Sequence, residues 1–462
     1  MGEYEPVKGD EEDLVLTMEE GLAYKDIHQS SKISTCTKLD SGNITHRSNS
    51  KSHVIVIGGA EVVPPPPRRH LASLDVFRGL TVTLMILVDD AGGFFPSINH
   101  SPWNGVTLAD FVVPFFIFMV GLSLGLTYKK TTSRVDATIK AVFRTLKLLG
   151  LGLIFQGGYI HGINDLTFGV DLDRIRWWGI LQRIALAYFL TALCEIWITG
   201  DEEVKSELSL LKKYRFQWMV AAVVTIVYLF LLYGLYVPDW EFQIPSKDTS
   251  LEPTTFSVKC GVRGDTGPAC NAVGMVDRAV FGLKHLYKRP IYGRTKQCST
   301  KSPDYGPLPP NAPSWCQSPF DPEGLLSSMM AIVTCLIGLH YGHIIVHFKD
   351  HKDRILRWMI PAAGLVLIGF VFDFSGMHVN KPLYTLSYMC ITAGAAGILF
   401  TGIYVLVDMF GYRRPTFILE WMGMHALMIY VLIACNLLPI ILQGIYWKKP
   451  EHNILRLIGI GS

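Results

Sequence analysis

The stretch LADFVVPFFIFMVGLSLGLTY, residues 108–128, is long and apolar enough to cross a lipid bilayer as a helix. Asp110 is its only charged residue and lies near its start. A bilayer offers the backbone no water, so a crossing segment must satisfy its own hydrogen bonds, and a helix does so. Because similar segments recur along the chain, this stretch decides the fold class, which we expect to be an all-α, polytopic transmembrane helical bundle.

Apolar segments on both sides of this stretch bring the predicted number of membrane spans to about nine. Composition agrees, because 50% of the 462 residues are hydrophobic and only 18% are charged, against about 25% in soluble proteins. The net charge of +3 is too small to indicate a nucleic-acid partner. The predicted spans are residues 71–88, 108–128, 139–156, 180–199, 218–237, 325–346, 355–372, 383–407 and 417–442.

The two ends of the chain differ in composition from the apolar middle. Residues 1–66 are rich in Ser, Lys, Asp and Glu and run into a series of prolines, which predicts a disordered cytoplasmic tail. Residues 67–446 form the predicted transmembrane domain, and residues 447–462 a short C-terminal tail. The chain is acidic after Met1 and shows no signal peptide, so we expect the first span to direct membrane insertion.

Basic residues cluster before the first span and in the short turns after spans two, four, six and eight, for example at Arg68, Lys129 and Arg413. With nine spans, all these positions lie on the same side of the membrane, which the positive-inside rule assigns to the cytosol. The long segment between spans five and six, residues 238–322, is then expected to lie in a lumen or outside the cell.

This long segment contains four of the nine cysteines. An even number of cysteines in a Pro- and Gly-rich segment on the oxidising side of a membrane predicts two disulfides. Three pairings stay open, and free thiols are the alternative. The four residues are Cys260, Cys270, Cys298 and Cys316.

Ionisable residues within spans indicate function by default, because they are costly to place in a membrane. Asp75 and Arg78 are three residues apart at the cytosolic start of the first span, so they share a helix face. They form either a structural ion pair at the interface or a site where Arg78 binds an anionic ligand that enters from the cytosol.

Polar residues also recur at the predicted luminal helix ends, which indicates a lined cavity; a rim of helix-capping residues is the alternative. His100 is the only histidine in the short luminal loop after span one, and it is either a general base or a solvated loop residue. Pro114 removes the helical hydrogen bond that the carbonyl of Asp110 would otherwise accept. The other polar residues in this set include Asp89, Asp90, Asn104, Arg183 and Lys381.

Four histidines lie along the predicted cytosolic end of span six, and some of their spacings suit metal ligation on a helix. The sequence offers no matching set of carboxylates or cysteines there. We therefore interpret them as interface residues and expect no metal site; they are His340, His343, His347 and His351.

Several motifs resemble the heparan-α-glucosaminide N-acetyltransferase family of transmembrane acyltransferases. The stretches SLDVFRGL (73–80), VDDAGG (88–93), HSPWNG (100–105) and LADF (108–111) with Pro114 carry the resemblance. GILQR (179–183), DPEG (321–324), and Asn380-Lys381 with LSY (386–388) extend it over most of the membrane part. The double Asp followed by Ala-Gly-Gly is most similar to the plant members.

The resemblance implies transfer of an acetyl group from cytosolic acetyl-CoA, as co-substrate, to a luminal amino-sugar or glycan acceptor. The family's active-site histidine matches His100. Asp89 stands where animal members carry Asn, which leaves the acceptor and the path of the proton open. We therefore expect catalytic roles for His100, Asp110 and Asp89, acetyl-CoA binding at Arg78 and Asp75, and acceptor binding at Asp90, Asn104, Arg183 and Lys381.

Two mechanisms stay open, direct transfer to the acceptor and transfer through an acetyl-histidine intermediate. A transporter of a small polar solute is the alternative function, which the lack of a recognisable internal repeat disfavours. The expected partners are the lipid bilayer and the acceptor, without nucleic acid, and homo-oligomer formation stays open. We expect a multi-pass protein of the endomembrane system (vacuole- or lysosome-like, or Golgi) or of the plasma membrane. From the family we would expect one more helix after residue 442 than this sequence supplies.

Overall fold

The computed structural model describes residues 55–57, 60–62, 71–92, 95, 97–128, 133–160, 168–170, 175–200, 204, 206–244, 254–287 and 291–434. The chain divides into two units, Met1–Ala72 and Ser73–Ser462. In the first, β1 (Ile55–Ile57) and β2 (Ala60–Val62) pair as a short antiparallel hairpin, which the sequence reading did not predict. The rest of the predicted tail at 1–66, and the C-terminal tail at 447–462, lie outside the described residues.

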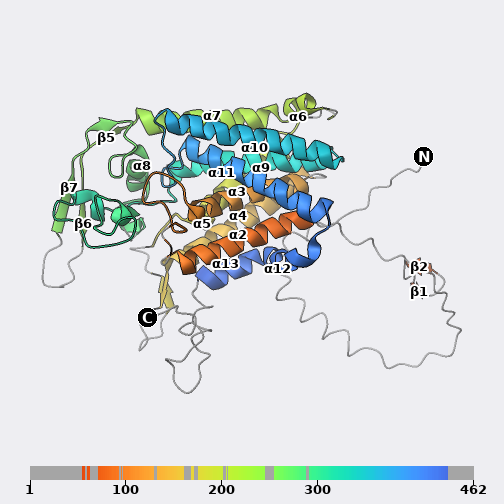
Figure 1. The fold of residues 1–462 in the computed structure, drawn as a ribbon, viewed down its shortest axis with the longest axis horizontal. Coiled ribbons are helices and arrows are strands. Elements are labelled where there is room, and N and C mark those ends of the chain that lie inside the picture. Colours follow the sequence, from red (N-terminus) through yellow and green to blue (C-terminus); the bar gives the residue numbers. More distant parts are fainter. Residues whose placement is uncertain are drawn as a thin grey trace, which may run out of the picture. The chain divides into compact units, whose positions relative to one another are not determined.

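Each of the nine predicted spans coincides with a helix in the second unit, or with a pair of helices for the last span (Figure 1). The first four are α2 (Ala72–Ala91), α3 (Leu108–Thr127), α4 (Arg134–Gly157) and α5 (Ile180–Trp197). After a short helix, α6 (Glu207–Lys213), come α7 (Arg215–Gly234), α9 (Leu325–His347), α10 (His351–Phe374) and α11 (Leu386–Tyr404), which continues as a π-helical turn, η5 (Val405–Met409). The last pair is α12 (Arg413–Met424) and α13 (Ala426–Ala434).

In the described part of the chain, fewer than nine helices are apolar enough to cross a membrane. Among the described residues six qualify by length and composition, namely α3, α5, α7, α9, α10 and α11 with η5. The pair α12 and α13, bent by 68°, meets the same criterion when it is counted as one span. Helices α2 and α4 do not, because charged residues such as Asp75, Arg78, Lys140 and Arg144 interrupt them. The chain is a multi-pass membrane protein for which six to seven spans are supported, and the predicted count of about nine is not confirmed.

Helix α9 is the central element of the bundle, since nearly all its residues from Leu326 to Ile344 are buried. It packs most extensively against α3. A Cβ atom on Gly121 of α3 would lie 1.9 Å from the carbonyl oxygen of Cys335, and one on Gly338 of α9 would lie 2.0 Å from that of Phe118. Only glycine allows this backbone approach. Helix α3 also packs against α11, and the start of α3, where Asp110 lies, is next to the start of α11.

The segment 238–322, which we call the cystine loop, folds at one end of the bundle (Figure 1). Strands β6 (Trp240–Ile244) and β7 (Thr254–Val258) pair antiparallel, with Phe242 opposite Phe256. Strand β5 (Tyr236–Val237), which leads into the loop, pairs with β8 (Val262–Arg263). Helix α8 (Ala272–Phe281) and the 3₁₀ turns η2 (Leu283–His285), η3 (Ile291–Arg294) and η4 (Ser314–Gln317) follow, and a separate hairpin, β3 (Gly158–Ile160) with β4 (Phe168–Val170), extends α4.

Two disulfides hold the cystine loop, as predicted, and the structure selects one of the three pairings. Cys260 bonds to Cys270, and Cys298 bonds to Cys316. The sequence separations are 10 and 18 residues, so each bond closes a local turn. Closing such loops restricts the unfolded chain and thereby stabilises a region whose apolar core is small.

Candidate active site

The imidazole of His100 lies between a carboxylate and an ammonium group. Its Nδ1 is 2.8 Å from Oδ1 of Asp110 and 2.8 Å from Nζ of Lys381. The Lys381 ammonium is in turn 3.4 Å from Oδ1 of Asp110. The Asp110 side chain is fully buried, whereas 46% of the His100 side chain is exposed. The structure thus brings together three of the predicted site residues and leaves the imidazole accessible to a ligand.

Hydrogen bonds fix both the side-chain carboxylate and the main-chain carbonyl of Asp110. Its Oδ2 accepts from the backbone N–H groups of Ser101 and Thr107, each at 3.1 Å. Its main-chain carbonyl, which Pro114 deprives of a helical donor, accepts from the hydroxyl of Tyr388 at 2.5 Å. The carboxylate therefore points at His100 from a rigid position at the start of α3.

The loop that carries His100 is held from the α10–α11 side by Asn380. The Asn380 side-chain amide donates to the carbonyl of Trp103 at 3.2 Å and to Oδ1 of Asn104 at 3.1 Å. The N–H of Gly105, whose φ of +99° favours glycine, donates to the carbonyl of Val379 at 2.7 Å. Asn104, predicted to bind the acceptor, therefore joins the loop that carries His100 to the loop that carries Lys381.

The cystine loop holds the same segment from the other side. Nε1 of Trp103 donates to the carbonyl of Thr266 at 3.1 Å, and the indole ring packs against Tyr292 and Phe320. The guanidinium of Arg294 donates to the main-chain carbonyl of His100 itself. The disulfide-bonded region is therefore part of the support of the site.

Two neighbours of Nδ1 favour opposite tautomers of His100. The Asp110 carboxylate only accepts hydrogen bonds and favours a hydrogen on Nδ1, whereas the Lys381 ammonium only donates and favours a bare Nδ1. We assign the hydrogen to Nδ1 because the Asp110 carboxylate is fully buried and faces it. Nε2 is then the basic nitrogen. Partial burial, and after it the nearby Lys381 ammonium, lower the pKa of His100 below its usual 6.5, against the opposing effects of Asp110 and Glu323. The ring is consequently neutral near pH 7 and able to accept a proton.

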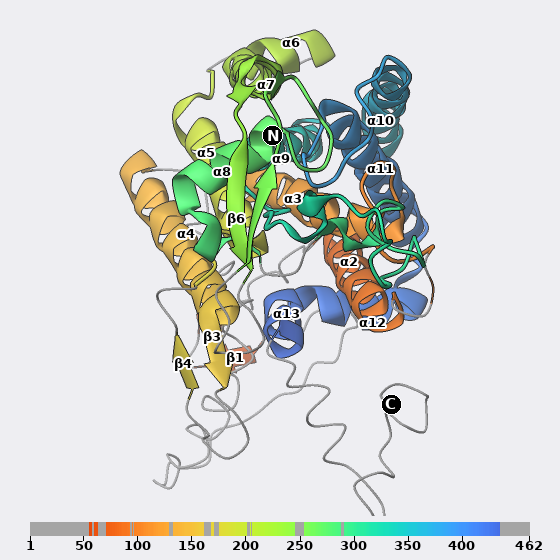
Figure 2. The ribbon, with the colours of Figure 1, turned by 90° about the vertical axis from the view of Figure 1, so that its left-hand side faces the viewer.

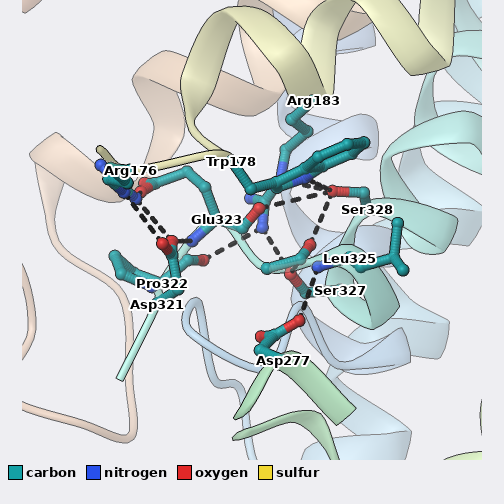
Figure 3. Close-up of polar contacts among 11 residues, drawn as sticks. Arg176, Trp178, Arg183, Asp277, Asp321, Pro322, Glu323, Leu325, Ser327 and Ser328 are labelled. Atoms are coloured by element: carbon teal, nitrogen blue, oxygen red, sulfur yellow. Dashed lines mark hydrogen bonds and ion pairs between the residues drawn. The ribbon is translucent and has the colours of Figure 1, made fainter. Parts of the chain in front are cut away.

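A second polar cluster joins the start of α5 to the start of α9 (Figure 3). The Arg176 guanidinium binds Asp321 through two nitrogens and also binds Glu323. Burial raises the pKa of Asp321 in spite of this pairing. For Glu323 burial acts in the same direction, but the charges of Arg176 and then Arg183 outweigh it and lower the pKa.

Arg183 belongs to this second cluster, and among the described residues its hydrogen-bond partners do not include His100. Its guanidinium donates to the carbonyl of Pro322 at 3.0 Å and to the hydroxyls of Ser327 and Ser328 at 2.5 and 3.3 Å. Only 2% of the residue is exposed. Its guanidinium is thus occupied by protein groups, and its role in acceptor binding stays a prediction.

The remaining predicted residues lie on α2. Asp89 is near the end of the helix with an exposed side chain, and the side chain of Asp90 lies outside what the structure describes. Near the start, Nη1 of Arg78 donates to Asp75 at 2.9 Å, and Nη2 lies 3.4 Å from Oγ of Ser123 on α3. About a quarter of the Arg78 side chain (23%) is exposed, while its guanidinium contacts Asp75 and Ser123.

The histidines of α9 are more enclosed than the sequence suggested. His343 is 1% exposed, its Nε2 is 2.9 Å from Oε2 of Glu195, and the Tyr214 ring stacks on it at 3.6 Å between centroids. The interpretation of His343 as an interface residue is therefore replaced by a buried carboxylate–imidazole pair between α5 and α9. Within the described part of the chain, no group of three or more His, Cys, Asp and Glu residues is arranged to hold a metal ion.

Sequence comparisons show which known proteins this chain is similar to. The family model described as "Heparan-alpha-glucosaminide N-acetyltransferase, catalytic" matches residues 70–200, a range that includes His100 and Asp110. The heparan-alpha-glucosaminide N-acetyltransferases of Mus musculus and Homo sapiens are 28% and 29% identical to this chain over 382 residues. These matches cover 78% of this chain and 53% and 52% of the relatives, so the chain spans about half the length of the curated relatives it matches.

Proposed function

Because this chain is related to the heparan-alpha-glucosaminide N-acetyltransferases, we propose that it is a membrane acetyltransferase which uses acetyl-CoA and acetylates an amino-sugar or glycan acceptor. The single observation that supports this best is the accessible His100 imidazole on a buried Asp110 carboxylate. Acetyl transfer to an amine needs a base for one proton, and a neutral imidazole held by a carboxylate is the usual group for that task.

In the proposed reaction, Nε2 of His100 accepts a proton from the acceptor nitrogen as this nitrogen forms a bond to the thioester carbonyl carbon. The carbon–sulfur bond then breaks, and the CoA thiolate takes the proton back from His100. Asp110 stabilises the imidazolium that exists between these steps, as a buried carboxylate does for the histidine of other acyl-transfer enzymes.

Lys381 has two roles in this proposal. Before the reaction, its ammonium keeps the His100 imidazole neutral, since two positive charges 2.8 Å apart repel each other. During the reaction, its three N–H donors can stabilise the negative charge that develops on the carbonyl oxygen. This differs from the role in acceptor binding that the sequence suggested, although an acceptor close to His100 would also meet Lys381.

Arg78 is the proposed contact for the phosphates of acetyl-CoA. It lies eleven residues before Asp89 on α2, which is about 16 Å along a helix axis. Binding the charged nucleotide at one end of α2 and the acceptor at the other would let the acetyl group reach His100 without moving the CoA across the membrane. The predicted orientation puts Arg78 on the cytosolic side.

The test uses the purified full chain, labelled acetyl-CoA and a set of amino sugars that begins with glucosamine. We expect acetyl transfer, and we expect His100→Ala to lower turnover by about 10²- to 10⁴-fold without weakening acetyl-CoA binding. His378→Ala is the matched control, because His378 forms an exposed pair with Asp373 at 3.4 Å in the loop that also carries Lys381. Normal transfer by a folded His100→Ala protein would refute the role of His100. Saturable solute flux without acetyl-CoA binding would favour a transporter instead.

A further inference from the structure

Helices α4, α5 and α8 are labelled in Figure 2. Residues of these helices, with Trp177 and Trp178 just before α5, line a cleft of about 450 Å³ that none of the contacts of His100 reaches. Its volume is within the range of small-molecule sites, about 300–1,000 Å³. The walls are almost entirely apolar, with one polar side chain, Gln182. The lining residues are Leu149, Leu153, Trp177, Trp178, Gln182, Val280 and Phe281.

Gln182 is the feature that points to a ligand. The residue is 1% exposed, yet neither its amide oxygen nor its amide nitrogen has a hydrogen-bond partner among the described residues. The amide lies against Gly152 of α4, where an added Cβ would come within 2.6 Å of Oε1. A buried unpaired amide costs about 1–3 kcal/mol, so a bound group that hydrogen-bonds to Gln182 would recover this loss.

The surroundings of the cleft indicate what kind of ligand enters it. The outward face of α4 exposes large apolar side chains, among them Phe143, Leu146 and Ile154. Lys140 and Lys147 are exposed on the same helix, so this surface is amphipathic, as expected of a helix in contact with the lipid–water interface. Leu149 and Leu153 continue this surface into the cleft. Trp177, 40% exposed, lies at the cleft, and tryptophan is enriched where a bilayer meets water.

We propose that the cleft binds an acyl chain of a membrane lipid, whose ester or hydroxyl group hydrogen-bonds to Gln182. The chain packs on Trp178, which stacks on Phe281 and donates from Nε1 to Oγ of Ser328 at 3.1 Å. Ser328 also accepts from Arg183, so the lipid lies against the polar cluster at the start of α9. The proposal does not depend on acetyl transfer.

The test is photo-crosslinking of the full chain in lipid nanodiscs with a phospholipid that carries a diazirine on one acyl chain. We expect crosslinks to the residues around Leu149 and around Val280. Val280→Trp should reduce them at least about fivefold, because Val280 is 56% exposed and a larger side chain there fills the cleft without disturbing the core. Ala279→Trp is the matched control, since Ala279 is exposed on the same helix and does not line the cleft.

A second variant, Gln182→Leu, separates lipid binding from general contact with the bilayer. In delipidated protein, Gln182→Leu should melt at the same temperature as wild type or higher, because it removes an unpaired buried amide. Added phospholipid should raise the melting temperature of wild type by several degrees more than that of Gln182→Leu. Crosslinks spread evenly over the outward face of α4 and unchanged in Val280→Trp, or equal lipid stabilisation of wild type and Gln182→Leu, would overturn the proposal.

Discussion

Replacing Lys381 by Met should move the acidic limb of the pH–rate profile to higher pH. The active form of His100 is neutral, so activity falls as the pH drops through the His100 pKa, which is lowered in the folded protein. Removing the Lys381 charge raises that pKa and therefore shifts the loss of activity upwards. With the 2.8 Å separation and water-like screening, appropriate for a ring that is 46% exposed, the repulsion is about 1.5 kcal/mol, so the limb should move by about one pH unit.

The assay is the release of free CoA in the presence of glucosamine, followed as kcat/KM from pH 5 to 9. Titration of the acceptor amine is common to all variants, so it cancels in the ratio of variant to wild type. Lys381→Arg retains the positive charge and should leave the limb where it is, even if the rate falls. The reasoning would be refuted if folded Lys381→Met had the wild-type limb, or one shifted to lower pH. Asp110 and Glu323 are present in every variant and cannot cause the difference.

Three further changes test other parts of the site. Asp110→Asn should lower turnover less than His100→Ala and leave acetyl-CoA affinity unchanged, because an amide can still orient the ring but cannot stabilise the imidazolium; equal loss in both variants would contradict this. Arg78→Ala should weaken acetyl-CoA binding in equilibrium titration with a smaller effect on turnover at saturation, whereas unchanged affinity in a folded protein would exclude Arg78 from the binding site. Arg176→Ala removes the ion-pair partner of two buried carboxylates and should cost about 3–5 kcal/mol at pH 8. Because the two carboxylates then take up protons more readily, the loss in melting temperature should be smaller at pH 5. Glu207→Gln is the control: it breaks a half-exposed ion pair with Arg357 at 2.9 Å and should cost at most about 1 kcal/mol at either pH.

The helices could be predicted because long apolar segments have one form in a membrane, but their bends could not. The sequence predicted one last span at 417–442, whereas the structure ends α12 at Met424 and begins α13 at Ala426 with a 68° bend. Residues 435–442 lie outside the described range. The hydropathy of a segment indicates that it lies in the membrane, but a straight helix and a bent pair of helices have the same hydropathy. The same limit hid α8 and the hairpins of the cystine loop, whose segments are too short to give a membrane signal.

The parts of the site that lie close together in the sequence could be predicted, and the contacts between distant segments could not. His100 and Asp110 are ten residues apart, so a loop that leads into a helix can bring them together. Asp89 and Asp90 are as near to His100 in sequence, and the structure selects Asp110 as the partner. Lys381 lies 281 residues after His100, and its direct contact with the ring depends on how α11 packs against α3. Pro114 showed that the Asp110 carbonyl loses its helical donor, but nothing in the sequence named Tyr388 as the replacement.

The position of His100 therefore depends on segments that are far apart in the chain. Its carboxylate partner is held by α11 through Tyr388, its loop by the α10–α11 connection through Asn380, and its own carbonyl by the cystine loop through Arg294. Local hydrogen bonds add to these contacts: the N–H groups of Ser101 and Thr107 donate to Asp110 at 3.1 Å, and the N–H of His100 donates to Oδ1 of Asn99 at 2.8 Å. A base that reacts with a bound substrate must be placed to within a fraction of an ångström. An exposed loop of a few residues cannot hold such a position by itself, so the disulfide-bonded segment outside the bundle contributes to the proposed catalysis through rigidity, although it supplies none of the reacting groups.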